Sequence, residues 1–298
     1  MHAALPSHCS AEPSDAFVDA SVFETPNVAI GVFRCPPRYE SFRDTGPIQR
    51  HIVVFPRTAV WIRHEGSRTF LADPSVTTIY NAAQCYERFV ASPDGDRCDW
   101  FAVSDDLARE IVRAFDARAA ETSEPFRFAW VPSSAGLYLR QRLLLRRALA
   151  GDLDRLGAEE AAIGIVASVM ALAYRASTRA QCSARHRELA DAARVELLRS
   201  ASANHSVHDI AHAIGTSAFH LCRVFRSCTG RTLHQHRMEL RLRLVLEQME
   251  DARNARNLSA LAHDAGFSSH AHLVRAMRQH LDAVPSNLRR LLAQSDTD

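Results

Sequence analysis

The sequence predicts an α+β fold in which a small antiparallel β-barrel and several helices precede an all-α C-terminal domain. Three observations predict it. Short β-branched runs broken by turns continue to about residue 103, helical periodicity follows from Ser104, and one segment near the C-terminus repeats itself. The 298 residues allow about two domains. A composition of 47% hydrophobic and 23% charged residues is typical of a globular protein.

The first 26 residues are polar and contain several Pro and Ser, which predicts a flexible N-terminal segment (1–26). This segment lacks the apolar stretch of a signal peptide, and no apolar run approaches the ~20 residues of a membrane helix. We therefore expect a cytoplasmic protein without membrane contact. The seven cysteines are scattered and odd in number, which favours free thiols packed as small hydrophobic side chains.

Residues 27–103 carry the strand-like runs, which are NVAIGVF, HIVVFP, TAVWIRHEG, VTTIY and CDWFAV. Their spacing predicts a barrel or a sandwich. The turn signal SPDG (92–95) predicts a hairpin between YERFV and CDWFAV, in which Cys85 and Cys98 would lie too far apart for a disulfide. The candidate ligand-pocket residues are Trp61, Arg63, Tyr80 and Trp100. The sequence leaves open whether these side chains line a pocket or belong to the core.

Residues 104–180 are helical in pattern, and Ser104 is placed to cap the first of these helices. The stretch 156–176 is apolar around much of its circumference, which predicts burial inside the domain or against a second copy of the chain. We expect this region to couple the two domains and to form a homodimer.

The repeat lies in the C-terminal part, where IAHAIGTS (210–217) matches LAHDAGFS (261–268). In the first copy Ser206 and Asp209 form a capping box, Gly215 ends the first helix and Ser217 caps the second. Two short helices joined by a glycine-containing turn are a helix-turn-helix unit, whose second helix enters the major groove of DNA.

The second helix of each copy carries an apolar face and an outer stripe with arginine at the same two positions. The outer stripes are Phe219, Cys222, Arg223 and Arg226 in the first copy and Ala271, Val274, Arg275 and Arg278 in the second. Arginine reads guanine through two hydrogen bonds, and small apolar groups contact the thymine methyl group. The 12 arginines against 6 acidic residues between Ile210 and Arg290 favour a polyanion as the partner. Together with the two helix-turn-helix units, they predict double-stranded DNA.

The connector between the copies, residues 232–251, has Met238, Leu242, Val245, Leu246 and Met249 on one stripe. Twenty helical residues span roughly 30 Å. Successive major-groove faces on one side of a duplex are ~34 Å apart. The connector therefore has the length needed to present both units to one side of DNA.

Residues 190–290 resemble the DNA-binding domain of the AraC family of bacterial transcription regulators, most clearly in SVHDIAHAIGTSAFHLCRVFRSCTGRTLHQHRMELRLRLVL and LSALAHDAGFSSHAHLVRAMRQHL. The resemblance implies seven helices in a DNA-binding domain at 185–293, with Phe219, Cys222 and Arg223 reading bases in the first unit. In the second unit it assigns base reading to His270, Ala271 and Arg275. Ser217, His220 and Ser269 complete the expected contact set. Asp282 stands where the family usually has glycine.

The N-terminal half resembles, less specifically, the cupin-like sensor domain of such regulators. This implies a small-molecule effector bound within residues 27–103 and, for an activator, RNA polymerase as a partner. We therefore expect a sequence-specific regulator with no catalytic residue, metal or cofactor.

Two alternatives stay open. One is a cupin-type metal or redox enzyme or sensor with an accessory DNA-binding module, for which His51 and His64 or the thiols of Cys35 and Cys98 would be the candidates. The other is a protein-interaction adaptor that keeps the helix-turn-helix fold without binding DNA.

Overall fold

The computed structural model describes residues 16–177, 182–250 and 257–293. The strands are β1 (Val18–Glu24), β2 (Val28–Cys35), β3 (Asp44–Thr45), β4 (His51–Pro56), β5 (Val60–His64), β6 (Phe70–Ala72), β7 (Val76–Tyr80), β8 (Tyr86–Val90), β9 (Asp96–Val103) and β10 (Trp130–Pro132). The helices are η1 (Glu40–Phe42), α1 (Asp105–Arg113), α2 (Ala117–Ala120), α3 (Ala135–Leu149), α4 (Arg155–Ser177), α5 (Ala184–Arg199), α6 (Val207–Ala213), α7 (Ala218–Thr229), α8 (Leu233–Glu250), α9 (Leu258–Asp264), α10 (His270–Leu281) and α11 (Pro285–Ala293).

The strands form two antiparallel sheets, in the orders β1-β2-β9-β4-β7-β10 and β3-β8-β5-β6. The prediction of an antiparallel β domain is confirmed, but the closed barrel is wrong because, among the described residues, no ladder joins the two sheets. Residues 1–15 of the segment predicted to be flexible (1–26) lie outside the described residues. The rest of that segment includes β1, which pairs with β2 along the edge of the larger sheet. Its alternating pattern of half-buried and exposed side chains is typical of an edge strand.

The predicted hairpin at residues 86–103 is also wrong. Strand β8 pairs with β3 and β5, whereas β9 pairs with β2 and β4 in the other sheet. The turn between them therefore carries the chain from one sheet to the other. A buried ion pair at 2.7 Å joins Arg88 of β8 to Asp96 of β9 across this connection. Sequence alternation gave no sign that this strand pair crosses between sheets.

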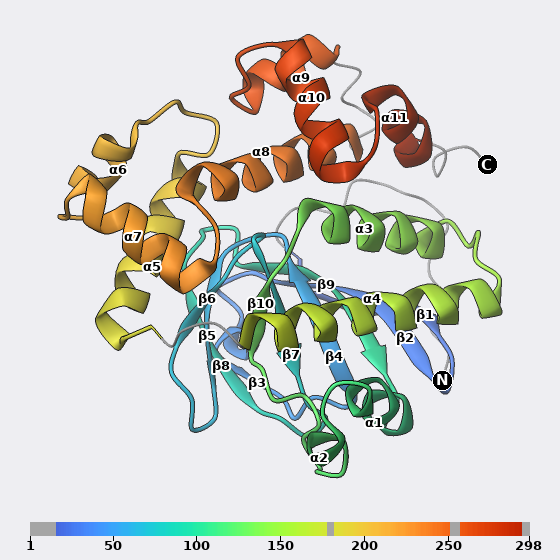
Figure 1. Ribbon diagram of the computed structural model, residues 1–298. Coiled ribbons are helices and arrows are strands. Elements are labelled where there is room, and N and C mark those ends of the chain that lie inside the picture. Colours follow the sequence, from blue (N-terminus) through green and yellow to red (C-terminus); the bar gives the residue numbers. More distant parts are fainter. Residues whose placement is uncertain (1–15, 178–181, 251–256, 294–298) are drawn as a thin grey trace.

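Helices α3 and α4 lie side by side and cover one face of the larger sheet (Figure 1). Helix α4 is long and apolar enough to cross a membrane by length and composition alone. A core helix passes the same test, and the inner residues of α4 do pack in the core against β2, β4 and β9. Burial of this helix within the domain agrees with the prediction for residues 156–176. Its outer face remains partly exposed, with Leu156 75% exposed.

Helices α5–α7 form the first helix-turn-helix unit with its supporting helix, and α9–α11 form the second on the far side of α8 (Figure 1). The predicted connector stripe is confirmed, because all five of its side chains pack in the core of the second unit. That core also takes in Ala135, Tyr138 and Leu139 of α3. Helix α8 is thus shared between the second unit and the N-terminal domain.

The turn glycines of the two units occupy different surroundings. Gly215 and Gly266 both have positive φ, at +69° and +83°. A Cβ on Gly215 would meet nothing within 4 Å, whereas a Cβ on Gly266 would lie 2.2 Å from the backbone oxygen of Ser202. The loop at Ser202 is held from behind by Arg241 of α8, whose Nε donates to the Ala201 oxygen at 2.7 Å. The turn of the second unit therefore packs directly on the loop that follows α5 in the first unit.

We predict that Gly266→Ala destabilises the protein much more than Gly215→Ala. A left-handed alanine costs about 1–2 kcal/mol at either site. Only at residue 266 does overpacking add roughly 1–3 kcal/mol. Differential scanning calorimetry of both variants checks this. Equal losses in Tm would show that the contact with Ser202 relaxes without cost.

A buried histidine lies at the start of α8. The ring of His236 packs edge-on against Phe225 at 5.4 Å, and in the described part of the chain its Nε2 has no hydrogen-bond partner. Desolvation lowers the pKa of His236 to about 3, despite the opposing attraction of Asp73. The folded state therefore holds this ring neutral, while the unfolded chain protonates it near its ordinary pKa.

We predict that the free energy of unfolding falls as the pH is lowered from about 6.5. In this range His236 binds a proton in the unfolded state but stays neutral in the folded state. Each such group adds up to about 1.4 kcal/mol per pH unit to the slope. In urea unfolding between pH 6.5 and 4.5, His236→Gln should show a shallower slope. His64→Gln should act likewise, since burial lowers the pKa of His64 to about 4. Unchanged slopes in both variants would contradict this origin.

Candidate nucleic-acid interface

Side-chain caps fix where the helices of both units begin. Ser206 and Asp209 form the predicted capping box at α6, and the Ser217 hydroxyl accepts from the His220 amide at α7. In the second unit, Asn257 caps α9 and Ser269 caps α10. The caps satisfy amides that a helix leaves unpaired, so they set the start and register of each second helix.

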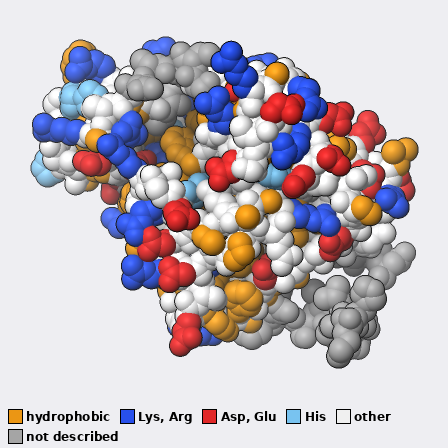
Figure 2. Space-filling model, turned by 90° about the horizontal axis from the view of Figure 1, so that it is seen from below, with side chains coloured by type: hydrophobic (Ala, Val, Ile, Leu, Met, Phe, Trp, Pro, Cys, Tyr) orange, Lys and Arg blue, Asp and Glu red, His pale blue; other side chains and the backbone are white. Residues whose placement is uncertain are grey.

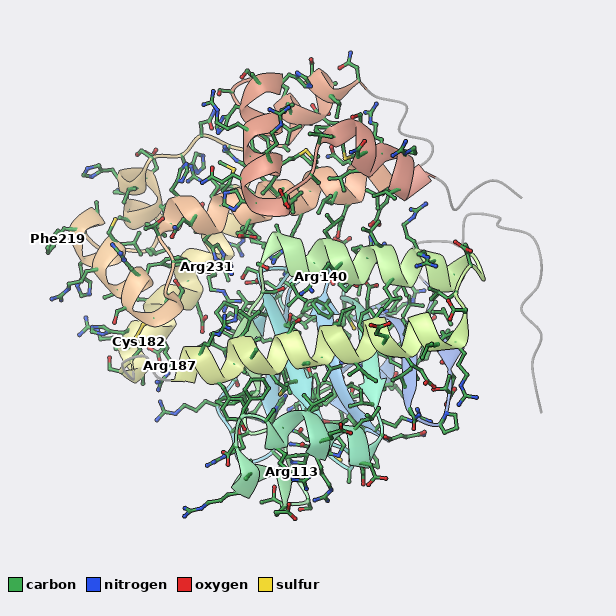
Figure 3. All side chains as sticks on the ribbon, turned by 45° about the vertical axis from the view of Figure 1, so that its right-hand side comes forward. Arg113, Arg140, Cys182, Arg187, Phe219 and Arg231 are labelled. Atoms are coloured by element: carbon green, nitrogen blue, oxygen red, sulfur yellow. A yellow bond between two sulfur atoms is a disulfide. The ribbon has the colours of Figure 1, made fainter. Side chains whose placement is uncertain are left out.

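Helix α7 presents the two faces that the sequence predicts. Leu221, Val224 and Phe225 are buried, at no more than 1% exposed. The opposite face is open, with exposed Cys222, Arg223 and Arg226. Phe219, in the first turn, is 80% exposed and projects from the outer edge of the first unit (Figure 3). An aromatic ring left this open is unusual for a side chain without a partner surface.

Helix α10 repeats the arrangement. Leu273, Ala276 and Met277 are buried, whereas an outer face is exposed or half-buried and consists of His270, Ala271, Val274, Arg275 and Arg278. The four arginine side chains of the two stripes therefore all lie outside the core.

The two helices end in the same backbone conformation but on different residue types. Helix α7 ends on Gly230 at φ 71°, and α10 ends on Asp282 at φ 50°. Both residues adopt the left-handed conformation that favours glycine. Asp282 is therefore a non-glycine residue at a glycine position.

Positive charge gathers on the lobe formed by α5–α7. In Figure 2 this lobe carries blue and pale-blue side chains, whereas acidic and basic side chains are mixed over the rest of that face. The exposed members include Arg185, Arg187, Arg223, Arg226 and His212. Such a patch attracts a polyanion.

Buried charges join α8 to the N-terminal domain. The Arg142 guanidinium of α3 bonds Asp99 of β9 at 2.6 Å and also Glu250 at the end of α8. The Tyr138 hydroxyl donates to Glu247 at 2.8 Å. Near the middle of α8 the Arg243 guanidinium donates to the Ser133 oxygen at 2.9 Å. The sequence did not predict any of these contacts, because charged residues on a long helix are typical of a solvent-exposed surface.

The first unit docks through α5. The Arg194 guanidinium bonds the Asp73 carboxylate at 2.6 Å and the Leu71 oxygen at 3.0 Å, both on the β6 side of the smaller sheet. Burial alone would raise the pKa of Asp73, but the charge of Arg194 and the hydrogen bonds from Ser75 outweigh it, so the pKa is lowered. This carboxylate stays ionised and anchors the first unit.

The predicted ligand-pocket residues divide between two hollows. Tyr80 and Trp100 line a cavity of about 440 Å³ between the two sheets. Trp61 and Arg63 face the opposite way, because Val60 and Ile62 take the inner face of β5. They line a second hollow of about 960 Å³ between the smaller sheet and α5–α7, which we call the interdomain cleft.

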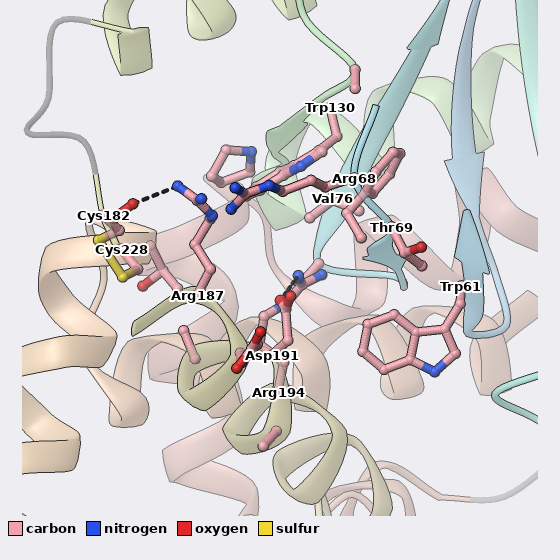
Figure 4. Close-up of a pocket in the computed structure, with 18 of the residues that line it drawn as sticks. Trp61, Arg68, Thr69, Val76, Trp130, Cys182, Arg187, Asp191, Arg194 and Cys228 are labelled. Atoms are coloured by element: carbon pink, nitrogen blue, oxygen red, sulfur yellow. Dashed lines mark hydrogen bonds and ion pairs between the residues drawn. A yellow bond between two sulfur atoms is a disulfide. The ribbon is translucent and has the colours of Figure 1, made fainter. Parts of the chain in front are cut away.

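The interdomain cleft combines arginines with flat aromatic rings. Its walls include Trp130, which stacks with Phe70 at 6.3 Å, and Arg68 and Arg187, whose guanidinium groups point into the same part of the cleft (Figure 4). Within the described residues Arg68 makes no hydrogen bond or ion pair. Arg68 therefore brings an unpaired guanidinium to a cleft whose walls also include the carboxylates of Glu188 and Asp191.

The cysteines depart from the sequence prediction. Cys182 and Cys228 form a disulfide at the edge of the interdomain cleft, so the expectation of free thiols throughout is wrong for this pair. Sequence spacing could not reveal it, because the two residues are 46 positions apart. Cys85 and Cys98 do not pair.

The two thiols considered as redox sensors, Cys35 and Cys98, are buried, and burial raises the pKa of both. Across the described ranges no three His, Cys, Asp or Glu side chains are placed to hold a metal ion.

Comparison with known proteins identifies the C-terminal domain. Residues 210–291 match the family model of a helix-turn-helix domain. No curated protein matches the chain in sequence. An apo variant of ToxT from Vibrio cholerae strain SCE256 is similar at 9% identity, covering 90% of this chain and 98% of its own, with a TM-score of 0.37.

A regulator from Chromobacterium violaceum with an AraC-type DNA-binding domain shares 24% identity over 38% of this chain and 98% of its own, with a TM-score of 0.35. Likenesses this distant carry no argument about the ligand of the N-terminal domain. The repeated two-helix units, their matching outer stripes and the family match in residues 210–291 agree. Residues 210–291 of this chain are therefore a helix-turn-helix domain, the fold of a DNA-binding module.

Proposed function

We propose that this protein regulates transcription by reading two adjacent major-groove segments with α7 and α10. The observation that carries the proposal is the pair of exposed stripes, each with arginine at the same two positions behind a capped turn. Arg223 and Arg275 lie nearer the N-terminal ends of their helices, where base edges are contacted. Arg226 and Arg278 lie one turn further on, where phosphate contacts are expected.

The remaining exposed side chains fit the same surface. Phe219, Ala271 and Val274 offer apolar contact to a thymine methyl group, and Cys222 adds a small side chain. Ser217, His220, Ser269 and His270 surround the helix starts, where phosphate groups approach. The 18 residues of α8 span about 27 Å, which is about four-fifths of the ~34 Å turn of a duplex.

Selection of duplexes from a random pool by the purified full-length protein tests this function. We predict enrichment of two short motifs whose centres lie about 10 base pairs apart, one for each unit. A single motif would mean that only one helix reads bases. If no duplex is enriched, and any residual association with DNA does not weaken as the salt concentration rises, the adaptor alternative is favoured.

We predict that Arg223→Ala and Arg275→Ala each weaken binding to the selected duplex by about 1–3 kcal/mol and relax the preference at one base position. Arg226→Ala should instead weaken binding to all sequences alike and reduce the salt slope by about 1. Arg113→Ala is a matched control, because Arg113 is an exposed arginine of α1 at the bottom of the molecule in Figure 3, away from Phe219 at its left edge. Unchanged affinity and footprint for Arg223→Ala would rule out its role in reading bases.

We further propose that the regulator responds to an organic anion bound in the interdomain cleft. A ligand there would contact the smaller sheet through Trp130 and Arg68 and the first unit through Arg187. Because those contacts exist only while the two parts face each other, the ligand would favour the docked arrangement over others. Dimerisation through the exposed side of α4, and contact with RNA polymerase if the protein activates transcription, complete the proposal.

Two naphthalene probes test the cleft. The sulfonate 8-anilinonaphthalene-1-sulfonate should bind with a fluorescence rise that Arg68→Gln reduces, because one guanidinium is lost. The uncharged N-phenyl-1-naphthylamine has the same rings and should be insensitive to that substitution. Equal effects on both probes would show that Arg68 shapes the walls rather than binding the anion.

A further inference from the structure

We propose that Cys182 and Cys228 are an oxidant-sensing thiol pair, which on oxidation ties the chain entering the DNA-binding domain to the first recognition helix. Their Cα atoms are 5.6 Å apart, within the range that a disulfide spans without backbone movement. The inference rests on the proposed function, because DNA-binding proteins work where thiols are kept reduced. A disulfide in such a compartment is usually transient and regulatory rather than structural.

The pair is accessible, unlike the thiols of Cys35 and Cys98. Both residues are half-exposed and line the interdomain cleft, which is open enough for a small oxidant. Cys35 and Cys98 are buried in the N-terminal domain, and burial raises the pKa of both, so they hold less of the reactive thiolate.

The surroundings of Cys182 favour its thiolate. It directly precedes Ser183, the cap of the 16-residue helix α5, so the positive end of that helix faces it. Arg187 reaches back from the first turns of α5 and donates to the Cys182 backbone oxygen, which brings a guanidinium beside the residue (Figure 4). Both features stabilise a negative sulfur atom.

The oxidant is a peroxide. The Cys182 thiolate attacks one oxygen of hydrogen peroxide, the O–O bond breaks, hydroxide leaves and a sulfenic acid forms. The Cys228 thiolate then attacks that sulfur, the S–S bond forms and a second hydroxide leaves. The two thiol protons convert both hydroxides to water. Two electrons pass from the thiol pair to the peroxide, and a cellular dithiol returns them when the pair is reduced.

The position of the bond determines its effect. Cys182 is five residues beyond Ser177, the end of α4, and Cys228 is in the last turn of α7. With the bond closed, α7 is tethered to the N-terminal domain by that short stretch. With the bond open, the covalent path runs through α5, α6 and most of α7. Oxidation therefore holds the first unit in its docked position and limits its adjustment to a duplex that α10 also contacts.

The test compares the full-length protein treated with dithiothreitol or with hydrogen peroxide. Fluorescence anisotropy with the selected duplex should show at least about fivefold weaker binding after oxidation, the lower end of typical couplings. Cys182→Ser and Cys228→Ser should bind like the reduced protein under both conditions. Cys85→Ser, which removes an exposed thiol of the N-terminal domain, should keep the full response.

Non-reducing peptide mapping identifies the bond directly and requires no variant. The proposal is overturned if peroxide leaves residues 182 and 228 unlinked, or if the linked protein binds as tightly as the reduced one. It is also overturned if Cys182→Ser still loses affinity on oxidation, because the exposed Cys222 of α7 would then be responsible. If neither form binds any duplex, the proposed function fails, and the peptide map alone decides the thiol chemistry.

Discussion

The requirement that buried charges find partners holds this protein together around α8. Arg142 and Glu250 are almost entirely removed from water, and each is stabilised only because the other is present with Asp99 nearby. Removing one member of such a pair leaves an unpaired buried charge at a cost of about 3–5 kcal/mol. Since Arg142 belongs to the N-terminal domain and Glu250 to the DNA-binding domain, the pairing fixes the two domains relative to each other. The apolar side of the same helix, α8, packs against the second unit and fixes its position.

This arrangement makes the docking of the two domains polar and specific rather than broadly apolar. Glu247 is shared by Tyr138 and Arg57, and Ser133 accepts from both Arg231 and Arg243. Polar contacts of this kind lose much of their stability when their geometry shifts, because a displaced partner leaves a desolvated group behind. The interface therefore depends on the exact placement of these polar partners.

The DNA-binding domain was largely predictable because its signals are local. The caps at Ser206 and Ser217, the glycine at residue 215 and the two stripes of α7 depend only on residues within a few helical turns. The register of the sheets was not predictable, because strand alternation does not say which strands pair. The exchange between sheets after β8 brings Arg88 next to Asp96, a contact that forms only in the tertiary structure.

The other contacts that the sequence did not predict also depend on tertiary packing. Cys182 and Cys228, Arg194 and Asp73, and Arg68 and Trp130 come together only when the first unit docks on the smaller sheet. The sequence predicted that Trp61 and Arg63 share a face but could not say which face was inside. Charged residues of α8 look like a solvated helix surface until a neighbouring domain covers them.

The left-handed aspartate at the end of α10 has a consequence for the order in which the two units meet DNA. The last turn of α7 is closed by a glycine that adopts this conformation without strain, while the last turn of α10 is closed by Asp282. The terminal turn of α10, which follows Arg278, therefore opens at a smaller free-energy difference than its counterpart. We expect the first unit to engage the duplex as a preformed surface and the second to settle afterwards, so that the lifetime of the complex is set mainly by α10.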